Sequence, residues 1–108
     1  MKYIFVYGIL QLNLQGKEFG LTKDKYIGRG ILDNYRRINL SSIQKAETKT
    51  RVNGKPIILH KVCGDIFHIE DDIEEDIYNF EHSCGYKRET VSVKCVNDNK
   101  IYKCIIYL

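Results

Sequence analysis

The architecture depends first on a segment near the start of the chain, Lys2-Tyr3-Ile4-Phe5-Val6-Tyr7-Gly8. Its β-branched and aromatic residues are nearly continuous, which is typical of a short strand buried on both faces. Gly8 ends this run, and a glycine there lets the backbone come close to a ligand. Successive free amides after such a strand can bind an anion, although an ordinary strand end has the same pattern. The segment therefore predicts a buried first strand followed by a candidate binding loop.

Further strands are expected along the rest of the chain, separated by turn-forming residues. Asp33 and Asn34 are residue types that favour turns, and they lie within a predicted hairpin or kinked strand pair. The stretch 41–54 is polar and predicted to be exposed, and its Asn53-Gly54 pair predicts a second turn. Gly64 interrupts a long β stretch, where a glycine often marks a bulge or a close backbone approach. The final two strands are joined by a turn at residues 97–99. The predicted strands span residues 2–7, 26–31, 35–40, 57–69, 86–96 and 100–107.

One helix is expected after the β stretch 57–69 and before the final two strands. Acidic residues fill positions 70–76, which suits the positive end of a helix dipole, and Asp71 or Asp72 could cap it. Ile73, Ile77 and Phe80 then follow at the spacing of one apolar helical face. Gly85 closes the helical region. A different segment, residues 12–24 after the first strand, has no clear period and is interpreted as a loop with room for one helical turn.

The most informative residue of this helix is Glu81. Extending the pattern by one position places it beside Ile73 and Ile77, away from the solvated acids Glu74, Glu75 and Asp76. A carboxylate removed from water has a raised pKa, which suits proton transfer near neutral pH. The alternative is structural: the last turn frays so that Glu81 reaches solvent, or Glu81 pairs with Lys87 or Arg88.

Length and charge limit the remaining possibilities. The chain has 108 residues, which supports one domain over 1–108, and its net charge of +3 is too small to indicate a nucleic-acid partner. Arg36, Arg37 and the basic stretch 45–55 are interpreted as solvated loops, with RNA binding as a weaker hypothesis. No apolar run approaches the roughly 18 residues needed to span a bilayer, so a cytoplasmic protein without membrane contact is expected.

The cysteines offer no metal site by their spacing. None of the four, which are Cys63, Cys84, Cys95 and Cys104, is separated from another by two residues. They are interpreted as small buried hydrophobic side chains, and no metal is expected.

Several segments, taken in order, resemble the gamma-glutamylcyclotransferase-like family. Residues 3–10 resemble its opening aromatic strand, which runs into Tyr-Gly-Thr-Leu or Tyr-Gly-Ser. Residues 31–38 look like its Gly-Tyr-Arg-Leu strand, and residues 62–69 look like its Val-x-Gly-Glu-Leu-Tyr-x-Ile. Residues 77–81 stand where the family has Leu-Asp-x-x-Glu, and residues 86–88 where it has Tyr-x-Arg. The order and spacing of these short motifs, over nearly the whole chain, carry the resemblance.

The resemblance implies an α+β fold built on a small mixed β-barrel flanked by one or two helices. It implies that a γ-glutamyl amine, or a related small γ-glutamyl substrate, is cyclised to 5-oxoproline with release of the amine, and that no cofactor takes part. Glu81 would be the base and then the acid, and the Tyr7-Gly8-Ile9-Leu10 loop would hold the substrate's α-carboxylate. Tyr86 would hydrogen-bond to substrate or to Glu81, or else be a core tyrosine. A monomer or a homodimer fits equally.

Two positions depart from the family pattern. Ile9 replaces the usual Thr or Ser, and Tyr78 replaces the usual Asp before the glutamate. A member that has lost its activity and serves as a binding module for a metabolite or a protein would show the same departures, so this alternative stays open.

Overall fold

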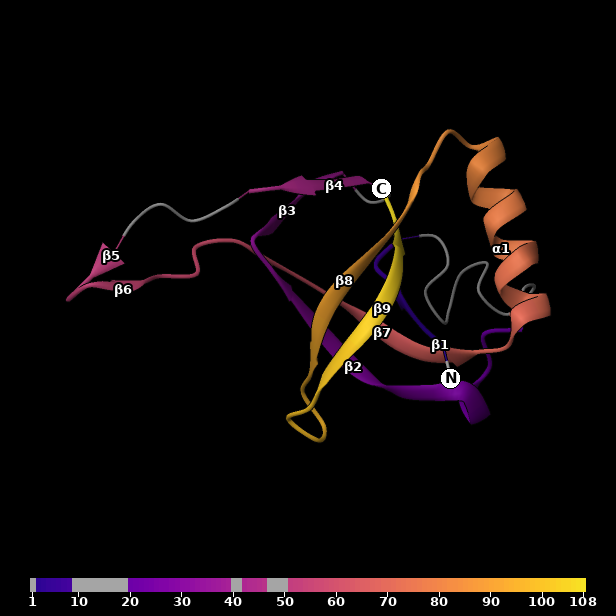
Figure 1. The fold of residues 1–108 in the computed structure, drawn as a ribbon, viewed down its shortest axis with the longest axis horizontal. Helices are drawn as coiled ribbons and strands as arrows, with labels where there is room; N and C mark the ends of the chain where they lie inside the picture. Colours follow the sequence, from indigo (N-terminus) through magenta and orange to yellow (C-terminus); the bar gives the residue numbers. More distant parts are fainter. Residues whose placement is uncertain (1, 9–19, 40–41, 47–50) are drawn as a thin grey trace.

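The computed structural model describes residues 2–8, 20–39, 42–46 and 51–108, and the side chain of Pro56 is left out of the description. Five strands form a closed barrel in the order β1-β7-β2-β8-β9, and the α-helix α1 (Asp71–Ser83) lies along its side (Figure 1). The barrel strands are β1 (Lys2–Val6), β2 (Tyr26–Asp33), β7 (Lys61–Ile69), β8 (Arg88–Cys95) and β9 (Ile101–Tyr107). The expected small barrel with a flanking helix is confirmed.

The barrel is mixed because of the first strand. β1 pairs antiparallel with β7 on one side and parallel with β9 on the other, while the remaining neighbours run antiparallel. One face of a barrel strand always points into the barrel. When the outer face is also covered, here by α1, both faces must be apolar. This explains the nearly continuous apolar run that the sequence shows there.

Successive side chains of β1 point into two different cores. Phe5, with Tyr7 just beyond the strand, belongs to the core inside the barrel, whereas Ile4 and Val6 belong to a second core between the barrel and α1. Ile77 of the helix is completely buried in that second core, and Ile73 and Phe80 pack against it. The predicted apolar face of the helix is therefore confirmed.

Gly64 is the point at which the barrel wall comes closest to its own interior. A Cβ added there would lie 2.3 Å from the Val6 carbonyl oxygen and 2.8 Å from Cζ of Phe5. The prediction of a close backbone approach at this glycine is confirmed.

The helix begins one or two residues earlier than the two cap candidates imply. Its N-cap is Glu70, in extended conformation and without a side-chain capping bond, so the predicted caps at Asp71 and Asp72 are wrong. Both residues lie inside the first turn, where their charge still favours the helix dipole. Gly85 adopts a φ of +88°, a left-handed conformation that favours glycine at a helix end, and the predicted end is confirmed.

The middle of the chain differs most from the prediction. Of the two arrangements expected around Asp33 and Asn34, the hairpin is wrong and the kinked strand pair is confirmed. The chain kinks at Asn34, whose φ is 66°, and β3 (Tyr35–Asn39) pairs with β4 (Ser42–Lys45) instead of with β2. β5 (Arg51–Val52) and β6 (Lys55–Pro56) form a hairpin through the expected turn at Asn53 and Gly54. β7 starts at Lys61, four residues later than predicted. The β5–β6 hairpin projects away from the barrel (Figure 1), whereas β4 lies against the barrel, since its Ile43 is buried in the core inside it.

Some expectations concern residues that are only partly described. Of the predicted loop 12–24, the structure describes residues 20–24, which lead into a short 3-10 helix, η2 (Lys23–Lys25). Cys95 and Cys104 are buried as expected, but Cys63 and Cys84 are exposed, so the cysteine prediction is wrong for these two. Within the described part of the chain, no helix has the length and apolar character needed to span a membrane.

Candidate active site

Glu81 lies in the last full turn of α1, with its side chain turned toward the barrel. It is 6% exposed, so the helix does not fray there and the solvated alternative is wrong. Across the described ranges, no hydrogen bond or ion pair to its carboxylate is found, so the alternative of pairing with Lys87 or Arg88 is also wrong. Burial raises the pKa of Glu81 to about 7. The carboxyl group can therefore exchange a proton near neutral pH.

The end of the helix positions Tyr86 relative to Glu81. The Tyr86 amide donates to the Glu81 carbonyl at 3.0 Å, and the Gly85 amide donates to the His82 carbonyl at 3.0 Å. These two bonds, with Gly85 in the left-handed conformation, form a Schellman motif, which brings the residue after the glycine back toward the last helical turn. Tyr86 is half-buried and packs against the same core as Ile77.

Tyr7 joins this group from the barrel side. Burial raises the pKa of its hydroxyl, and the neighbouring Tyr86 and Glu81 raise it further, while Arg37 acts in the opposite direction. Glu81 and Tyr86 therefore lie close enough to Tyr7 to act electrostatically on its hydroxyl, although the three residues come from separate segments. The Tyr7 hydroxyl donates a hydrogen bond to the backbone carbonyl of Tyr107. Its role in the structure is to fix the start of the loop.

Arg37 is a residue of this region that the sequence analysis missed. Its Nη1 donates to the Tyr7 carbonyl at 2.7 Å and its Nη2 to the Cys63 carbonyl at 3.4 Å. Its guanidinium carbon also lies 5.9 Å from the centre of the Tyr7 ring. The interpretation of Arg37 as a purely solvated residue is therefore wrong, because it holds the backbone at the end of β1 in place.

The rest of the predicted binding loop is only partly described. Gly8 is half-buried and lies in a bend directly after Tyr7. Ile9 and Leu10 lie outside the described residues, so the expectation that their amides bind the substrate's carboxylate stays a prediction.

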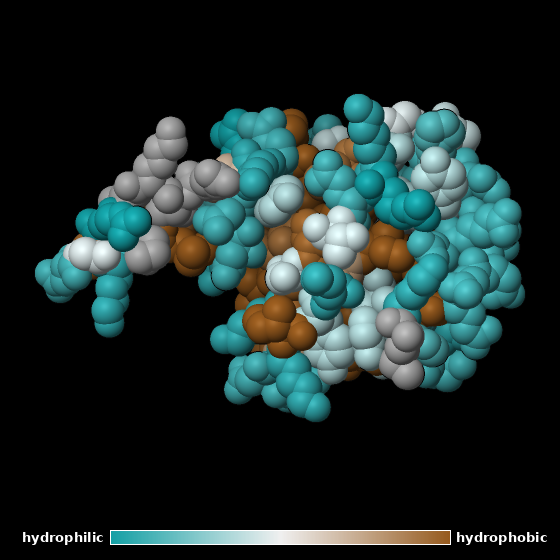
Figure 2. All heavy atoms as spheres, viewed as in Figure 1, coloured by the Kyte–Doolittle hydropathy of each residue, from teal (hydrophilic) through white to brown (hydrophobic). Residues whose placement is uncertain are grey.

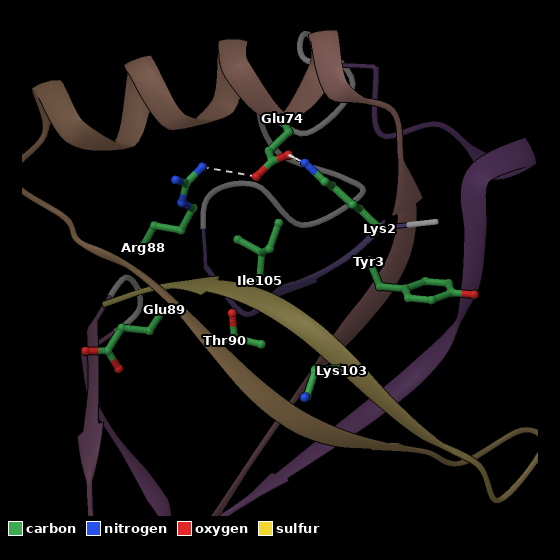
Figure 3. A pocket seen from close by; sticks show the side chains of 8 residues that line it. All are labelled: Lys2, Tyr3, Glu74, Arg88, Glu89, Thr90, Lys103 and Ile105. Atoms are coloured by element: carbon green, nitrogen blue, oxygen red, sulfur yellow. Dashed lines mark hydrogen bonds and ion pairs between the residues drawn. The ribbon is translucent and has the colours of Figure 1, made fainter.

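A second buried carboxylate on α1, Glu74, provides an instructive contrast. It was expected among the solvated acids, but it is only 8% exposed, so that expectation is wrong. Its Oε2 lies 2.5 Å from Lys2 Nζ and its Oε1 lies 3.0 Å from Arg88 Nη1 (Figure 3). Glu74 is neutralised by two cations, which is typical of a structural carboxylate. Glu81 lies seven residues further along the helix and has no such partner among the described residues.

Glu74 also borders a pocket on the outer face of the barrel, shown in Figure 3. The pocket has a volume of about 470 Å³ and is lined by Lys2, Tyr3, Glu74, Arg88, Glu89, Thr90, Lys103 and Ile105. Of the predicted site residues that the structure describes, Tyr7, Gly8, Glu81 and Tyr86, none lines it. Figure 2 shows that hydrophilic residues cover the side of the molecule where α1 lies. The exposed acids of the helix belong to this surface, whereas Glu74 and Glu81 are buried.

No metal-binding arrangement is found where the structure describes the chain, since no three His, Cys, Asp or Glu side chains there are grouped to hold an ion. The group around Glu81 offers one carboxyl and two phenols. Such a set can move protons and donate hydrogen bonds.

The raised pKa of Glu81 has a measurable effect on stability. Below about pH 4.5 the folded and unfolded chains both hold the proton; between pH 4.5 and about 7 only the folded protein keeps it. The contribution of Glu81 to the free energy of unfolding is therefore expected to fall as pH rises through this window. Chemical denaturation of the wild type and of Glu81→Gln at pH 4.5 and pH 8 measures it. The variant should gain relative to the wild type at pH 8, and an equal difference at both pH values would contradict the assigned burial.

Comparison with known proteins adds a family to this geometry. A family model described as gamma-glutamyl cyclotransferase, AIG2-like, matches residues 4–108. No curated protein sequence matches the chain.

Several solved structures share the fold. An uncharacterized protein from Pyrococcus horikoshii matches with a TM-score of 0.66 and 18% identity, over 99% of this chain and 76% of that one. An AIG2-like protein from Mus musculus matches with a TM-score of 0.64 and 20% identity, over the same shares of 99% and 76%. A protein named gamma-glutamyl cyclotransferase matches with a TM-score of 0.63 and 14% identity, over 99% of this chain and 65% of that one. At these identities, the likenesses establish the fold alone.

Proposed function

Because the chain belongs to the AIG2-like gamma-glutamyl cyclotransferase family, we propose that it cyclises a γ-glutamyl amine, or a related small γ-glutamyl compound, to 5-oxoproline. The substrate's own α-amine is the nucleophile and its γ-carbonyl carbon is the electrophile. Both reacting groups belong to one molecule, so the protein has to orient them and move protons. This chemistry requires no cofactor.

The observation that carries the proposal is the state of Glu81. It is a buried carboxyl with a pKa of about 7 and no cationic partner among the residues that the structure describes. A group with this pKa is present in both protonation states near neutral pH, which suits a base that must later act as an acid. The proposal is also supported by Tyr7, a residue of the family-like motifs, because Glu81 contributes to the raised pKa of its hydroxyl.

In the proposed reaction, ionised Glu81 removes a proton from the substrate's α-ammonium group. The freed amine attacks the γ-carbonyl carbon, and a new C–N bond closes the five-membered ring. The tetrahedral intermediate then collapses as the bond to the leaving nitrogen breaks. Protonated Glu81 gives its proton to that nitrogen, and the ionised Glu81 then passes the second proton of the ring nitrogen to the departing amine. The product keeps one N–H, the amine leaves as an ammonium ion, and Glu81 is ionised again for another cycle.

The loop after β1 is proposed to orient the substrate. The backbone amides of Gly8, Ile9 and Leu10 would hold its α-carboxylate, as amides at the end of a strand can. The bond from Arg37 to the Tyr7 carbonyl supports this role, because it fixes the backbone directly before the loop. Ile9 would contribute its amide and an apolar side chain in place of a hydroxyl.

A substrate panel tests the proposal. Purified protein is incubated with γ-glutamyl amines, γ-glutamyl-ε-lysine and γ-glutamyl dipeptides, and 5-oxoproline is quantified by mass spectrometry while thermal unfolding reports binding. Release of 5-oxoproline from at least one compound is expected. Stabilisation by a γ-glutamyl compound without turnover would instead identify a binding module, the alternative favoured by Ile9. Neither stabilisation nor turnover across the panel would contradict both.

A further inference from the structure

The hydroxyl of Tyr107 is a buried polar group that takes no part in the proposed reaction. The residue is 5% exposed, and this hydroxyl is the one buried side-chain polar atom without a hydrogen-bond partner in the described part of the chain. A buried hydroxyl without a partner costs free energy, and such groups are uncommon in folded proteins. A replacement by Phe would remove that cost, so the hydroxyl calls for a reason.

The backbone holds Tyr107 firmly in place. It ends β9, and its carbonyl accepts the hydrogen bond from the Tyr7 hydroxyl. The next residue, Leu108, exchanges two backbone hydrogen bonds with Lys87, each of 2.9 Å. Tyr107 is thereby fixed between the start of the candidate binding loop and the segment that follows the helix. Its side chain is buried in the core between the barrel and α1, together with Ile77.

The groups around this hydroxyl come from two elements. Burial is the main cause that raises the pKa of Tyr107 to about 12; Arg88 of β8 opposes the rise, and Glu74, Glu81 and Tyr78 of α1 add to it. The three helix residues follow at i, i+4 and i+7, so they form one stripe on the helix that faces the end of β9.

Two members of this stripe are already engaged. Glu74 pairs with Lys2 and Arg88, and the Tyr78 ring lies under the Arg88 guanidinium, whose central carbon is 4.7 Å from the ring centre. For the third member, Glu81, no donor to the carboxylate is found among the described residues, and burial raises its pKa. The same region therefore contains a fully buried hydroxyl without an acceptor and, on Glu81, a carboxylate that is largely but not completely buried and has no donor among the described residues.

We propose that the Tyr107 hydroxyl donates a hydrogen bond to the Glu81 carboxylate when that carboxylate is ionised. The bond requires the Glu81 side chain to turn toward β9. Tyr107 is then a positioning residue, which holds the ionised base in one orientation toward the Tyr7 loop. The pairing depends only on the structure, whereas its effect on turnover rests on the proposed function.

The test is Tyr107→Phe, which keeps the ring and removes only the hydroxyl. The Glu81 carboxyl is titrated by carbon-13 NMR in the free protein, with Glu81→Gln identifying its signal. Loss of a donor to the charged form is expected to raise the Glu81 pKa by about one pH unit. Tyr102→Phe is the matched control on the same strand, because its hydroxyl bonds to Asp98 at 2.6 Å in an exposed position, and it should leave the Glu81 titration unchanged.

Turnover supplies the second readout. If the proposed function holds, the acid limb of the pH profile of kcat/KM should shift to higher pH by the same amount in Tyr107→Phe. A shifted NMR titration in a protein without turnover would support the pairing and contradict the proposed function. An unchanged Glu81 titration in folded Tyr107→Phe would overturn the pairing, whatever the activity. A melting temperature at pH 5 equal to or above that of the wild type shows that the variant is folded.

Discussion

Glu81→Gln is expected to lower 5-oxoproline formation by about a hundred- to ten-thousand-fold, the range that general acid–base catalysis supplies. Gln has the size and shape of Glu but neither accepts nor returns a proton. The barrel should remain intact, because Glu81 makes no ion pair in the described structure and an amide avoids the cost of a buried charge. Initial rates at saturating substrate, with circular dichroism and thermal unfolding on the same sample, separate loss of chemistry from loss of fold.

Two acids on the same helix serve as controls. Glu75→Gln changes an exposed side chain and should leave both rate and stability near the wild-type values. Glu74→Gln removes the buried partner of Lys2 and Arg88, so it should lower stability while the folded fraction keeps its rate. A Glu81→Gln enzyme with wild-type turnover would remove Glu81 from the mechanism. Equal loss of turnover in all three variants would point to a general effect of helix charge.

Gly64→Ala is expected to destabilise the protein by about 3 kcal/mol, at the upper end of the usual cost of overpacking. The added methyl would lie 2.3 Å from the Val6 carbonyl oxygen, and a backbone atom inside a closed barrel cannot move aside easily. For a domain of this size, the loss corresponds to a fall in melting temperature of roughly 10–20 °C. Chemical denaturation measures the free energy directly.

Gly54→Ala is the matched control for this substitution. A Cβ at Gly54 meets no atom within 4 Å, so the cost is limited to placing alanine at a φ of +77°. That cost is about 1 kcal/mol. If Gly64→Ala were no more harmful than Gly54→Ala, the close approach between β1 and β7 would be contradicted.

The barrel and its helix could be predicted largely because apolar periodicity responds to burial. The run from Ile4 to Val6 is apolar at every position, and the structure buries both of its faces, one inside the barrel and one under α1. Ile73, Ile77 and Phe80 indicated the buried helix face in the same way. Gly64 was identified because few reasons other than space place a glycine inside a strand.

Periodicity could not separate the two buried carboxylates. Glu81 was placed correctly because it extends the apolar face, but Glu74 was assigned to solvent, although the stripe that it shares with Tyr78 and Glu81 faces β9. Its carboxylate is paired with Lys2, from the first strand, and with Arg88, from the strand after the helix. A pairing across 72 residues leaves no local pattern in the sequence.

The remaining members of the candidate site were also hidden by distance along the chain. Arg37 reaches the Tyr7 carbonyl across 30 positions, and only the kink at Asn34 brings it there. Tyr107 looks like an ordinary residue of a final strand. Its unusual property is a hydroxyl without a partner, which depends on the packing of α1 against the barrel.

The claim that Glu81 and the Tyr7 loop form one site is tested most directly by a crystal structure with 5-oxoproline bound. The expected result has the product's carboxylate on the amides of residues 8–10, and its ring nitrogen or carbonyl oxygen about 3 Å from the Glu81 carboxyl. Product bound elsewhere, for example in the pocket between Lys2, Arg88 and Lys103, with Glu81 out of reach, would contradict the account.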